Sequence, residues 1–559
     1  MNAPALPPCL DQALTAPSAA PTCGEALVAL LERYGVEYVF GIPGVHTVEL
    51  YRGLAASSLR HVTPRHEQGA GFMADGYARV TGKPGVCFII TGPGMTNIAT
   101  AMAQAYADSI PMLVISSVNA RRELGSGAGR LHELPSQRDV FAGLTAFSHT
   151  LLDAADLPQV LARAFAVFDG ARPRPVHIEI PLDVIVAPAD GIANAPIVPI
   201  ERPSPGVAAV TAAAGRLAAA KRPLILAGGG AAQAAAELRA LAERLHAPVT
   251  LTINAKGLLP AGHPLLVGST QSLPETRALV RDADVVLAVG TELGETDYDV
   301  VFDGGFAIDG ALLRIDIDAQ QAMRNFPPDV ALIGDSQQAL ASVLAQLDAY
   351  ALPPRDASWG GTRVAAVRDA IAAGRDATTR AQQRLIDTIV ESLPGVIVAG
   401  DSTSPVYVGN FTHDAPAPRA WFNSSTGYGT LGYGLPAAIG AKLAAPARPV
   451  VCLIGDGGLQ FTLPELASAV EARVPVIVLV WNNFGYGEIR KYMTARDIVP
   501  VGVDPYTPDF ITLARGFGCA ARTAANANEL ALALRDAATR AIPTVIEIRE
   551  ADWFAQSPA

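Results

Sequence analysis

The residues with the clearest chemical potential are Asp456, in a Gly-Asp-Gly turn, and Asn483, in an Asn-Asn-Phe-Gly sequence that ends at Gly485. The Asp456 carboxylate, the Asn483 amide oxygen and the Gly485 carbonyl would form a set of hard oxygen ligands. Such a set suits Mg²⁺, which keeps water and phosphate oxygens at its other positions. Gly457 and Gly458 follow the aspartate and would let backbone N–H groups approach a diphosphate.

Two apolar, β-rich runs would position these ligands, 452–454 before the aspartate and 475–481 before the asparagines. The segment 464–471 between them is typical of a helix, so the pattern predicts a strand, a glycine-rich turn, a helix, a strand and a loop. Asp456 and Asn483 would then lie at the carboxyl ends of neighbouring parallel strands, where open α/β sheets bind ligands. A Gly-Asp-Gly turn alone would be an ordinary connection, and its spacing to the asparagines favours the metal site.

A second group of candidate residues lies nearer the N-terminus. His46 comes just after the turn 41–44, which follows a short predicted strand at 38–40. Without further context His46 would be a capping or surface histidine. Glu67 stands near the start of the segment 65–79, whose small and apolar residues predict a largely buried helix. The helix dipole alone would also explain a carboxylate at that position.

These motifs together resemble the thiamine diphosphate enzymes, the family of pyruvate decarboxylase, acetolactate synthase and benzoylformate decarboxylase. The resemblance rests on the Gly-Asp-Gly and Asn-Asn motifs and on the helix that carries Glu67. It also rests on the turn 91–97, which follows a buried strand at 86–90, and on the closing strand 175–183. The motifs fall in the order of the family over nearly the whole chain.

The resemblance implies a role for each residue named so far. Asp456, Asn483 and the Gly485 carbonyl would hold Mg²⁺, which in turn would hold the diphosphate of thiamine diphosphate. Glu67 would be the catalytic glutamate that bonds the cofactor pyrimidine. His46 would protonate the reacting carbon or hydrogen-bond the substrate carboxylate, as a histidine can near neutral pH.

Further contacts are expected in the C-terminal third of the chain. Hydroxyl and N–H groups of Ser402 and Thr403, at a predicted helix start, suit a phosphate. The glycine-rich loop 426–434 would let backbone approach a flat ligand. The resemblance gives the Gly429 carbonyl to the aminopyrimidine and places Leu431 beneath the bend of the cofactor, although the two could instead be a packed turn glycine and a core leucine. The other implied contacts are Gly457, Gly458 and Tyr486 for the cofactor, Gln137 for the cofactor or substrate, and Glu488 for the substrate.

Length and composition indicate several α/β units. At 559 residues the chain has room for about three to four domains, and 50% of its residues are hydrophobic while 17% are charged. The expected fold class is α/β, with three doubly wound parallel-sheet domains of the thiamine diphosphate enzyme type. The predicted division is a disordered leader at 1–21, a pyrimidine-binding domain at 22–186, a linker at 187–206, a central domain at 207–346, a linker at 347–374, and a diphosphate- and metal-binding domain at 375–559.

The central unit carries glycines after two predicted strands, in Gly228-Gly-Gly230 and in the segment 290–294. This is the position of nucleotide-binding turns, but no clear G-x-G-x-x-G with a downstream ribose-binding acid accompanies them. In the family this domain is often structural, although the acetolactate synthase branch binds FAD there. FAD is therefore an alternative cofactor that is not expected to be required.

Charge and cysteine use limit the partners and the compartment. The net charge of −11 argues against nucleic acid or an anionic membrane as a partner, and no apolar run reaches the roughly 18 residues of a membrane helix. The segment 1–21 lacks the features of a signal peptide, and the five cysteines show no paired or metal-type spacing, so a reducing cytoplasm is expected. The resemblance implies a homodimer or homotetramer, because each site in the family is shared between two chains.

Three activities are compatible with these motifs. The first is non-oxidative decarboxylation of a 2-oxo acid to an aldehyde and CO2. The second is a carboligase of the acetolactate synthase type, which condenses 2-oxo acids. The third, a catalytically inactive regulatory subunit, is disfavoured because Glu67, Asp456 and Asn483 are all present. Motifs alone do not separate the first two activities.

The segments 41–51 and 130–135 most resemble the branch of the family that decarboxylates 2-ketoarginine (5-guanidino-2-oxopentanoate) in arginine catabolism, with 4-guanidinobutanal as the product. Glu488 stands where relatives often set substrate choice, and its carboxylate would pair with the substrate guanidinium. The simpler interpretation is that Glu488 pairs with Arg490, Lys491 or solvent at the start of a helix.

Overall fold

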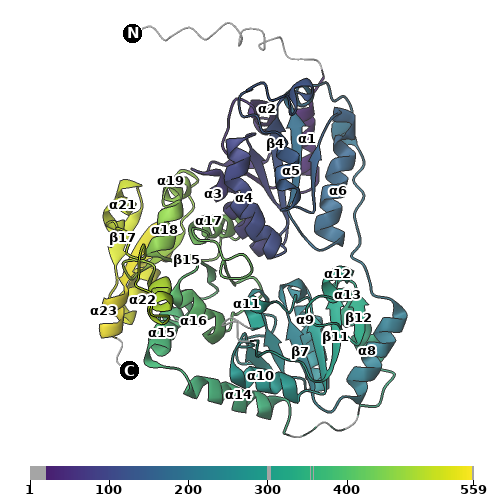
Figure 1. Ribbon diagram of the computed structural model, residues 1–559, viewed down its shortest axis with the longest axis vertical. Coiled ribbons are helices and arrows are strands. Elements are labelled where there is room, and N and C mark those ends of the chain that lie inside the picture. The colour runs from purple at the N-terminus through teal and green to yellow at the C-terminus, as the bar shows by residue number, and fades with distance from the viewer. Residues whose placement is uncertain (1–19, 299–303, 353, 355, 357, 557–559) are drawn as a thin grey trace.

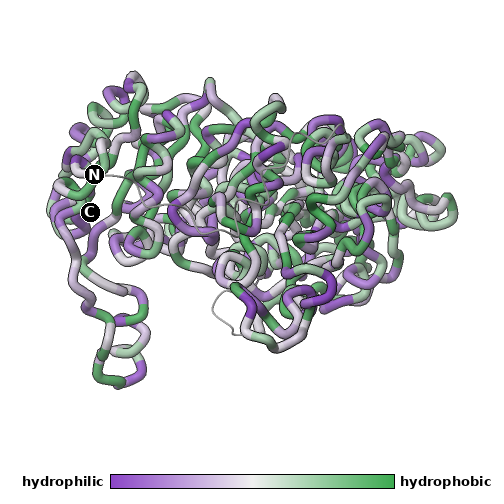
Figure 2. The backbone as a smooth tube through the Cα atoms, turned by 90° about the horizontal axis from the view of Figure 1, so that it is seen from above, coloured by the Kyte–Doolittle hydropathy of each residue, from purple (hydrophilic) through white to green (hydrophobic). Residues whose placement is uncertain are grey.

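The computed structural model describes residues 20–298, 304–352, 354, 356 and 358–556. They form an N-terminal, a middle and a C-terminal unit (Figure 1). Each unit contains one six-stranded sheet, and adjacent strands in all three sheets are parallel, so the predicted fold class is confirmed. Apolar and polar segments alternate along the coloured part of the tube in Figure 2, as expected when several sheets are covered by helices. The leader predicted at 1–21 lies almost entirely outside the described residues.

The N-terminal unit begins with a helix whose start the sequence specifies locally, because Thr22 and Glu25 form a capping box. Its strands are β1 (Tyr38–Gly41), β2 (Arg60–Val62), β3 (Gly85–Ile89), β4 (Met112–Val118), β5 (Phe147–Thr150) and β6 (Val176–Pro181). Its helices are α1 (Cys23–Arg33), α2 (Val48–Leu54), α3 (Glu67–Thr81), α4 (Pro93–Ala107), α5 (Gln137–Ala142), α6 (Leu157–Gly170) and α7 (Leu182–Ile185). The strands lie in the order β2-β1-β3-β4-β6-β5.

The middle unit has strands β7 (Pro223–Ala227), β8 (Val249–Leu251), β9 (Leu266–Gly268), β10 (Val285–Val289), β11 (Ala311–Asp316) and β12 (Val330–Ile333), in the order β12-β11-β10-β7-β8-β9. This is the strand order of dinucleotide-binding sheets. Its helices are α8 (Val207–Ala219), α9 (Ala235–Leu245), α10 (Pro274–Asp282), α11 (Glu295–Tyr298), α12 (Ala319–Ala322) and α13 (Ser336–Leu347). The segment 347–374, predicted as a linker, contains α14 (Gly361–Ala373), which packs Val364, Val367 and Ile371 into the core of this unit.

The C-terminal unit has strands β13 (Ile397–Gly400), β14 (Trp421–Asn423), β15 (Val450–Gly455), β16 (Ile477–Asn482), β17 (Ala520–Thr523) and β18 (Thr544–Arg549), in the order β14-β13-β15-β16-β18-β17. This order repeats that of the N-terminal sheet. The helices are α15 (Ala377–Ser392), α16 (Ser404–Thr412), α17 (Gly434–Ala444), α18 (Asp456–Thr462), α19 (Glu465–Glu471), α20 (Gly487–Thr494), α21 (Phe510–Gly516), α22 (Ala527–Ala538) and α23 (Glu550–Ala555). No helix among the described residues is long and apolar enough to cross a membrane.

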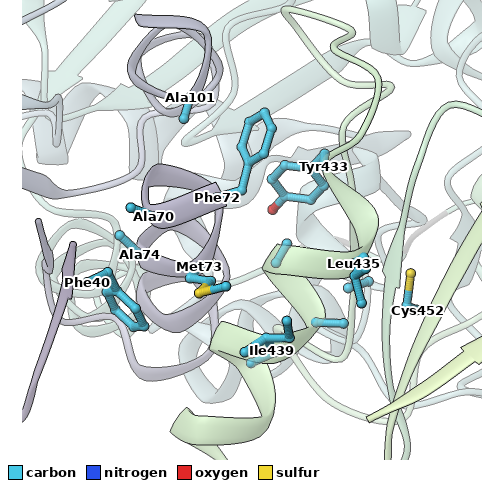
Figure 3. Close-up of a cluster of buried hydrophobic side chains, with 14 of the residues drawn as sticks. Phe40, Ala70, Phe72, Met73, Ala74, Ala101, Tyr433, Leu435, Ile439 and Cys452 are labelled. Atoms are coloured by element: carbon cyan, nitrogen blue, oxygen red, sulfur yellow. The ribbon is translucent and has the colours of Figure 1, made fainter. Parts of the chain in front are cut away.

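The N-terminal and C-terminal units pack together through α3 and α17. Met73 of α3 and Ile439 of α17 belong to one buried apolar cluster that spans both units (Figure 3). Glycines allow the helices to approach closely, because a Cβ at Gly76 would lie 2.0 Å from the Ala437 carbonyl oxygen and one at Gly440 would lie 1.9 Å from that of Met73. The helix that begins with the glutamate at position 67 is therefore held tightly against the C-terminal unit.

Candidate active site

The strand order of the C-terminal sheet reverses between β13 and β15, because the chain adds strands on one side of β13 and then on the other. Open α/β sheets bind ligands at such a point, at the carboxyl ends of the strands. Ser402 and Thr403 follow β13, Asp456 follows β15 and Asn483 follows β16. The prediction of a glycine-rich turn after β15 is wrong, because Asp456 is the first residue of α18. The N–H groups of a first helical turn have no carbonyl partner within the helix, so donors remain beside the carboxylate.

The oxygen ligands predicted for a metal lie together. One terminal atom of the Asn483 amide is 3.2 Å from Oδ1 of Asp456 and 2.7 Å from the carbonyl oxygen of Gly485. With nitrogen at this position the amide donates to both groups, whereas with oxygen there three oxygens converge without a proton between them and need a cation. A carboxylate with two neutral oxygens is a donor set that fits Mg²⁺. Within the described ranges, no three His, Cys, Asp or Glu residues form an alternative metal cluster.

The Asp456 carboxylate is 1% exposed and is oriented by two further donors. Its Oδ2 accepts hydrogen bonds from the Gly485 N–H at 2.9 Å and from the Thr507 hydroxyl at 3.2 Å. Burial raises the pKa of Asp456, and these hydrogen bonds oppose the increase. Thr507 was missed from the sequence because it lies in a loop without a motif.

The glycines around the aspartate make room for neighbouring side chains. A Cβ at Gly457 would lie 2.6 Å from Cε1 of Tyr486, so the tyrosine ring packs directly on this glycine. A Cβ at Gly458 would lie 3.1 Å from a carboxylate oxygen of Asp401. Close packing therefore favours glycine at position 457, and a side chain at position 458 would crowd the Asp401 carboxylate.

Asp401 is a second residue that sequence reasoning missed. Its buried carboxylate accepts the backbone N–H of Ser402 at 2.8 Å and that of Gly434 at 3.0 Å, and burial raises its pKa to about 6. It thus joins the end of β13 to the glycine-rich loop before α17. That loop exposes Gly429, at φ 76°, and leaves Leu431 half-buried. The signal available in the sequence is an acid that follows the apolar run 396–399 and directly precedes Ser402.

Glu67 is the first residue of α3, and the His66 side chain caps this helix by accepting the N–H of Gln68. Glu67 is half-buried, and its Oε2 accepts a hydrogen bond from the Asn97 amide of α4 at 2.9 Å. Among the residues that the structure describes, no hydrogen bond joins the Glu67 side chain to the C-terminal unit. Glu67 therefore lies in the N-terminal unit, whereas the Asp456 group, which we define as Asp456, Asn483 and Gly485, lies in the C-terminal unit.

Gln137 was expected to face the cofactor or substrate, but its side chain is 2% exposed. Its oxygen accepts hydrogen bonds from the Thr91 hydroxyl at 2.8 Å and the Gly92 N–H at 2.9 Å. Its nitrogen donates to Ser116, Ser117 and Glu179. Since both amide atoms are engaged inside the N-terminal unit, Gln137 orients the turn 91–97 and has no free atom for a substrate.

His46 lies against a histidine that the sequence analysis did not select, His132. The ring centroids are 5.2 Å apart, and Nδ1 of each ring is buried without a hydrogen-bond partner. Burial and the nearby His132 lower the pKa of His46. The backbone of His132, at φ 60°, packs on Gly92, where a Cβ would lie 2.6 Å from the His132 carbonyl oxygen. The histidine pair thus lies beside the turn 91–97, whose last residue, Asn97, donates a hydrogen bond to Glu67.

Glu488 lies in the first turn of α20 and pairs with Lys491 at 2.8 Å, with 39% of its side chain exposed. Burial raises the pKa of Tyr407 in α16, and the charge of Glu488 adds to this increase, so the two side chains are close enough to interact. The simpler of the two interpretations, a pair with Lys491, is present in the structure. The carboxylate remains accessible to a second cation.

The glycine turns of the middle unit lie where the strand order of its sheet reverses, between β7 and β10. Gly229 and Thr291 line a cavity of about 270 Å³ between the three units, which Arg172 and Arg419 also line. The cavity lies at the point where sheets with this strand order bind nucleotides.

Three family descriptions match successive parts of the chain. They are the N-terminal TPP (thiamine pyrophosphate, a synonym of thiamine diphosphate) binding domain of thiamine pyrophosphate enzymes over residues 21–142, the central domain over 210–343 and the C-terminal TPP binding domain over 402–548. A probable 2-ketoarginine decarboxylase of Pseudomonas aeruginosa is 50% identical, over 95% of this chain and 94% of the relative.

Acetolactate synthases are more distant relatives. The isozyme 1 large subunit of Escherichia coli is 31% identical over 94% of both chains, and the large subunit of Corynebacterium glutamicum is 33% identical over 93% of this chain and 86% of the relative. Because the family descriptions cover all three units, in order, and a relative is similar along nearly its full length, the resemblance inferred from the motifs is confirmed. The chain belongs to the thiamine pyrophosphate enzyme family.

Proposed function

We propose that this chain is a thiamine diphosphate- and Mg²⁺-dependent decarboxylase that converts 5-guanidino-2-oxopentanoate into 4-guanidinobutanal and CO2. The observation that carries the proposal is the 50% identity with a probable 2-ketoarginine decarboxylase over 95% of this chain. The free, buried cysteines at positions 23, 87, 452 and 519 are consistent with a reducing cytoplasm.

The C-terminal unit would hold the cofactor. Asp456, Asn483 and the Gly485 carbonyl would bind Mg²⁺, which would in turn hold the diphosphate. The remaining diphosphate contacts come from Ser402, Thr403, Gly457 and Gly458. The proposed contacts to the rest of the cofactor are the Gly429 carbonyl for the aminopyrimidine, Leu431 beneath the bend, and the Tyr486 ring. The assignment is supported by the two oxygens that converge on the Asn483 amide, Oδ1 of Asp456 and the carbonyl oxygen of Gly485.

When bound, thiamine diphosphate supplies a carbon nucleophile and an acceptor for the electrons left when CO2 departs. Glu67 holds a proton at the pyrimidine N1′, and Asn97 orients its carboxylate from α4. His46 moves a proton to the carbon that has lost CO2. His132 lies against His46 and its Nδ1 also lacks a partner, so in this proposal it takes part in the same proton transfer. In this proposal Glu488 receives the substrate guanidinium in exchange for part of its contact with Lys491.

The proposed active unit is a homodimer or a homotetramer. Glu67 and the Asp456 group lie in different units, and the described part of the chain shows no hydrogen bond from the Glu67 side chain to the C-terminal unit. A second copy would bring its own Asp456 group to this glutamate. Exposed apolar side chains around the metal ligands, including Phe484 and Ile489, agree with a covered surface there.

A second candidate function is a carboligase that condenses two 2-oxo acids. The similarity to acetolactate synthases at 31% and 33% identity favours it, and the cavity between the three units is a place where FAD could bind. We do not expect FAD to be required, because decarboxylation to an aldehyde involves no net oxidation.

Two measurements test the proposal. Specificity constants are compared for 2-ketoarginine, pyruvate and benzoylformate with thiamine diphosphate and Mg²⁺ present, and 2-ketoarginine should give the highest value. A preference for pyruvate would contradict the substrate assignment. Product analysis after incubation with single 2-oxo acids separates the two activities, since a decarboxylase releases an aldehyde and a carboligase releases a longer hydroxy-oxo acid.

A further inference from the structure

Glu465, the first residue of α19, is a buried carboxylate with no part in the site described so far. Its side chain is 1% exposed at the junction of the N-terminal and C-terminal units. Oε1 accepts the backbone N–H groups of Arg65 at 3.0 Å and of His66 at 3.1 Å. Oε2 accepts the Ser468 hydroxyl at 2.7 Å. A carboxylate of one unit therefore binds the backbone of another.

The backbone that Glu465 binds is the turn that starts α3. His66 is the N-cap of this helix and Glu67 is its first residue. Gly69 lies on the next part of the same turn, and a Cβ there would lie 2.2 Å from Oε1 of Glu465. The glycine thus leaves the space that the carboxylate occupies. N–H groups at and before a helix start need acceptors, and here the acceptor comes from the C-terminal unit.

We propose that Glu465 is a positioning residue for Glu67, because its carboxylate holds the first turn of α3 against the C-terminal unit. The position of Glu67 is then set from outside its own unit. The claim that this position matters for turnover rests on the proposed function. The clamp itself, which we define as the contact of Glu465 with the N–H groups of Arg65 and His66, does not depend on it.

The strength of the clamp depends on the charge of the carboxylate. Burial raises the pKa of Glu465 to about 7, opposed by the Ser468 hydroxyl, the two N–H groups and the charge of Arg65. The Arg65 guanidinium also pairs with Glu471, at the end of α19, and the His66 ring accepts the Gln68 N–H. A carboxylate accepts N–H groups more strongly than a neutral acid does. The clamp should therefore weaken as the pH falls through about 7.

Hydrogen exchange tests the clamp without any cofactor. In the full-length chain, Glu465→Ala should increase exchange at the Arg65 and His66 amides by about tenfold or more, since it removes two charge-assisted hydrogen bonds. Glu465→Gln keeps one acceptor oxygen and should give a smaller increase. Asp536→Asn is the matched control, because it removes an exposed carboxylate of the C-terminal unit whose partner, Arg540, lies just after the same helix, α22, and it should leave these amides unchanged. Unchanged exchange in both Glu465 variants would overturn the proposal.

A mutant cycle tests the positioning role. Glu465→Ala should lower kcat about tenfold or more, and Gly69→Ala should do the same, because its Cβ displaces the carboxylate from the other side. The double variant should be no worse than Glu465→Ala alone, since removal of the carboxylate leaves room for the new Cβ. Additive losses, or a wild-type kcat in Glu465→Ala with increased exchange, would contradict the positioning role.

The pH profile separates positioning from general packing. Wild-type kcat should fall toward the level of Glu465→Gln as the pH drops below about 7, and the variant should lack this part of the profile. Ser468→Ala removes a hydrogen bond that favours the charged carboxylate, so it should move this limb of the profile to higher pH. An identical acid limb in wild type and Glu465→Gln would contradict the proposal. A wild-type chain that decarboxylates no 2-oxo acid would contradict the proposed function instead, and the exchange results would still decide the clamp.

Discussion

Replacement of Glu488 by glutamine is the most direct test of the substrate assignment. A hydrogen bond between a carboxylate and a guanidinium contributes roughly 1.5 to 3 kcal/mol, which corresponds to about 10- to 150-fold in kcat/KM. The Glu488 side chain is 39% exposed and already pairs with Lys491 at 2.8 Å. Solvent and the competing lysine both reduce the gain from a second cation. We therefore expect Glu488→Gln to lower kcat/KM for 2-ketoarginine by about tenfold.

The assay compares 2-ketoarginine with pyruvate, which has no guanidinium. Glu488→Gln should leave kcat/KM for pyruvate within about twofold of wild type. Lys491→Met is the matched control, because it removes the competing cation of the same helix and should maintain or raise kcat/KM for 2-ketoarginine. Equal losses for both substrates would assign a general structural role to Glu488. An unchanged constant for 2-ketoarginine would refute the pairing and leave the substrate proposal standing.

Three further predictions follow from the site and the fold. Asp456→Ala should lose metal and cofactor binding together in titration calorimetry, whereas Glu67→Gln should bind cofactor but lose turnover; full activity of Glu67→Gln at saturating cofactor would exclude the proposed activation. Sedimentation should show a dimer or tetramer, and a fully active monomer would contradict the shared site. Burial lowers the pKa of Lys256 to about 7, below its unfolded value near 10.5. Wild-type stability should therefore rise from pH 7 toward pH 10 by up to about 1.4 kcal/mol per pH unit. Lys256→Met should lack this slope in thermal unfolding, and equal slopes would refute the assignment.

Local sequence patterns were sufficient for the elements that depend on neighbouring residues. The strand predicted at 38–40 lies within β1, and the strand predicted at 86–90 corresponds to β3. Runs of apolar residues bounded by glycine or proline report a buried strand because both faces of a parallel sheet are covered. Glycines usually mark turns, so the local pattern predicts a turn at 455–457, whereas α18 begins at Asp456.

The sequence alone indicated the family, and it predicts the residues that would hold a metal and a diphosphate, because these stand at strand ends in a fixed order along the chain. Contacts between distant residues required the tertiary structure. Thr507 reaches Asp456 from a loop, His132 meets His46 across a turn, and the two amide atoms of Gln137 are engaged inside its own unit.

The contact of Glu465 with the start of α3 shows the reason most clearly. Its partners are about 400 positions away in the sequence, and nothing in the local pattern of α19 distinguishes a buried carboxylate from an ordinary acid at a helix start. Burial is decided by how α3 and α17 cross, and that crossing depends on close approach at Gly76 and Gly440. Periodicity along the chain reports which face of an element is apolar, whereas only packing between units decides which polar groups lose water and must find partners.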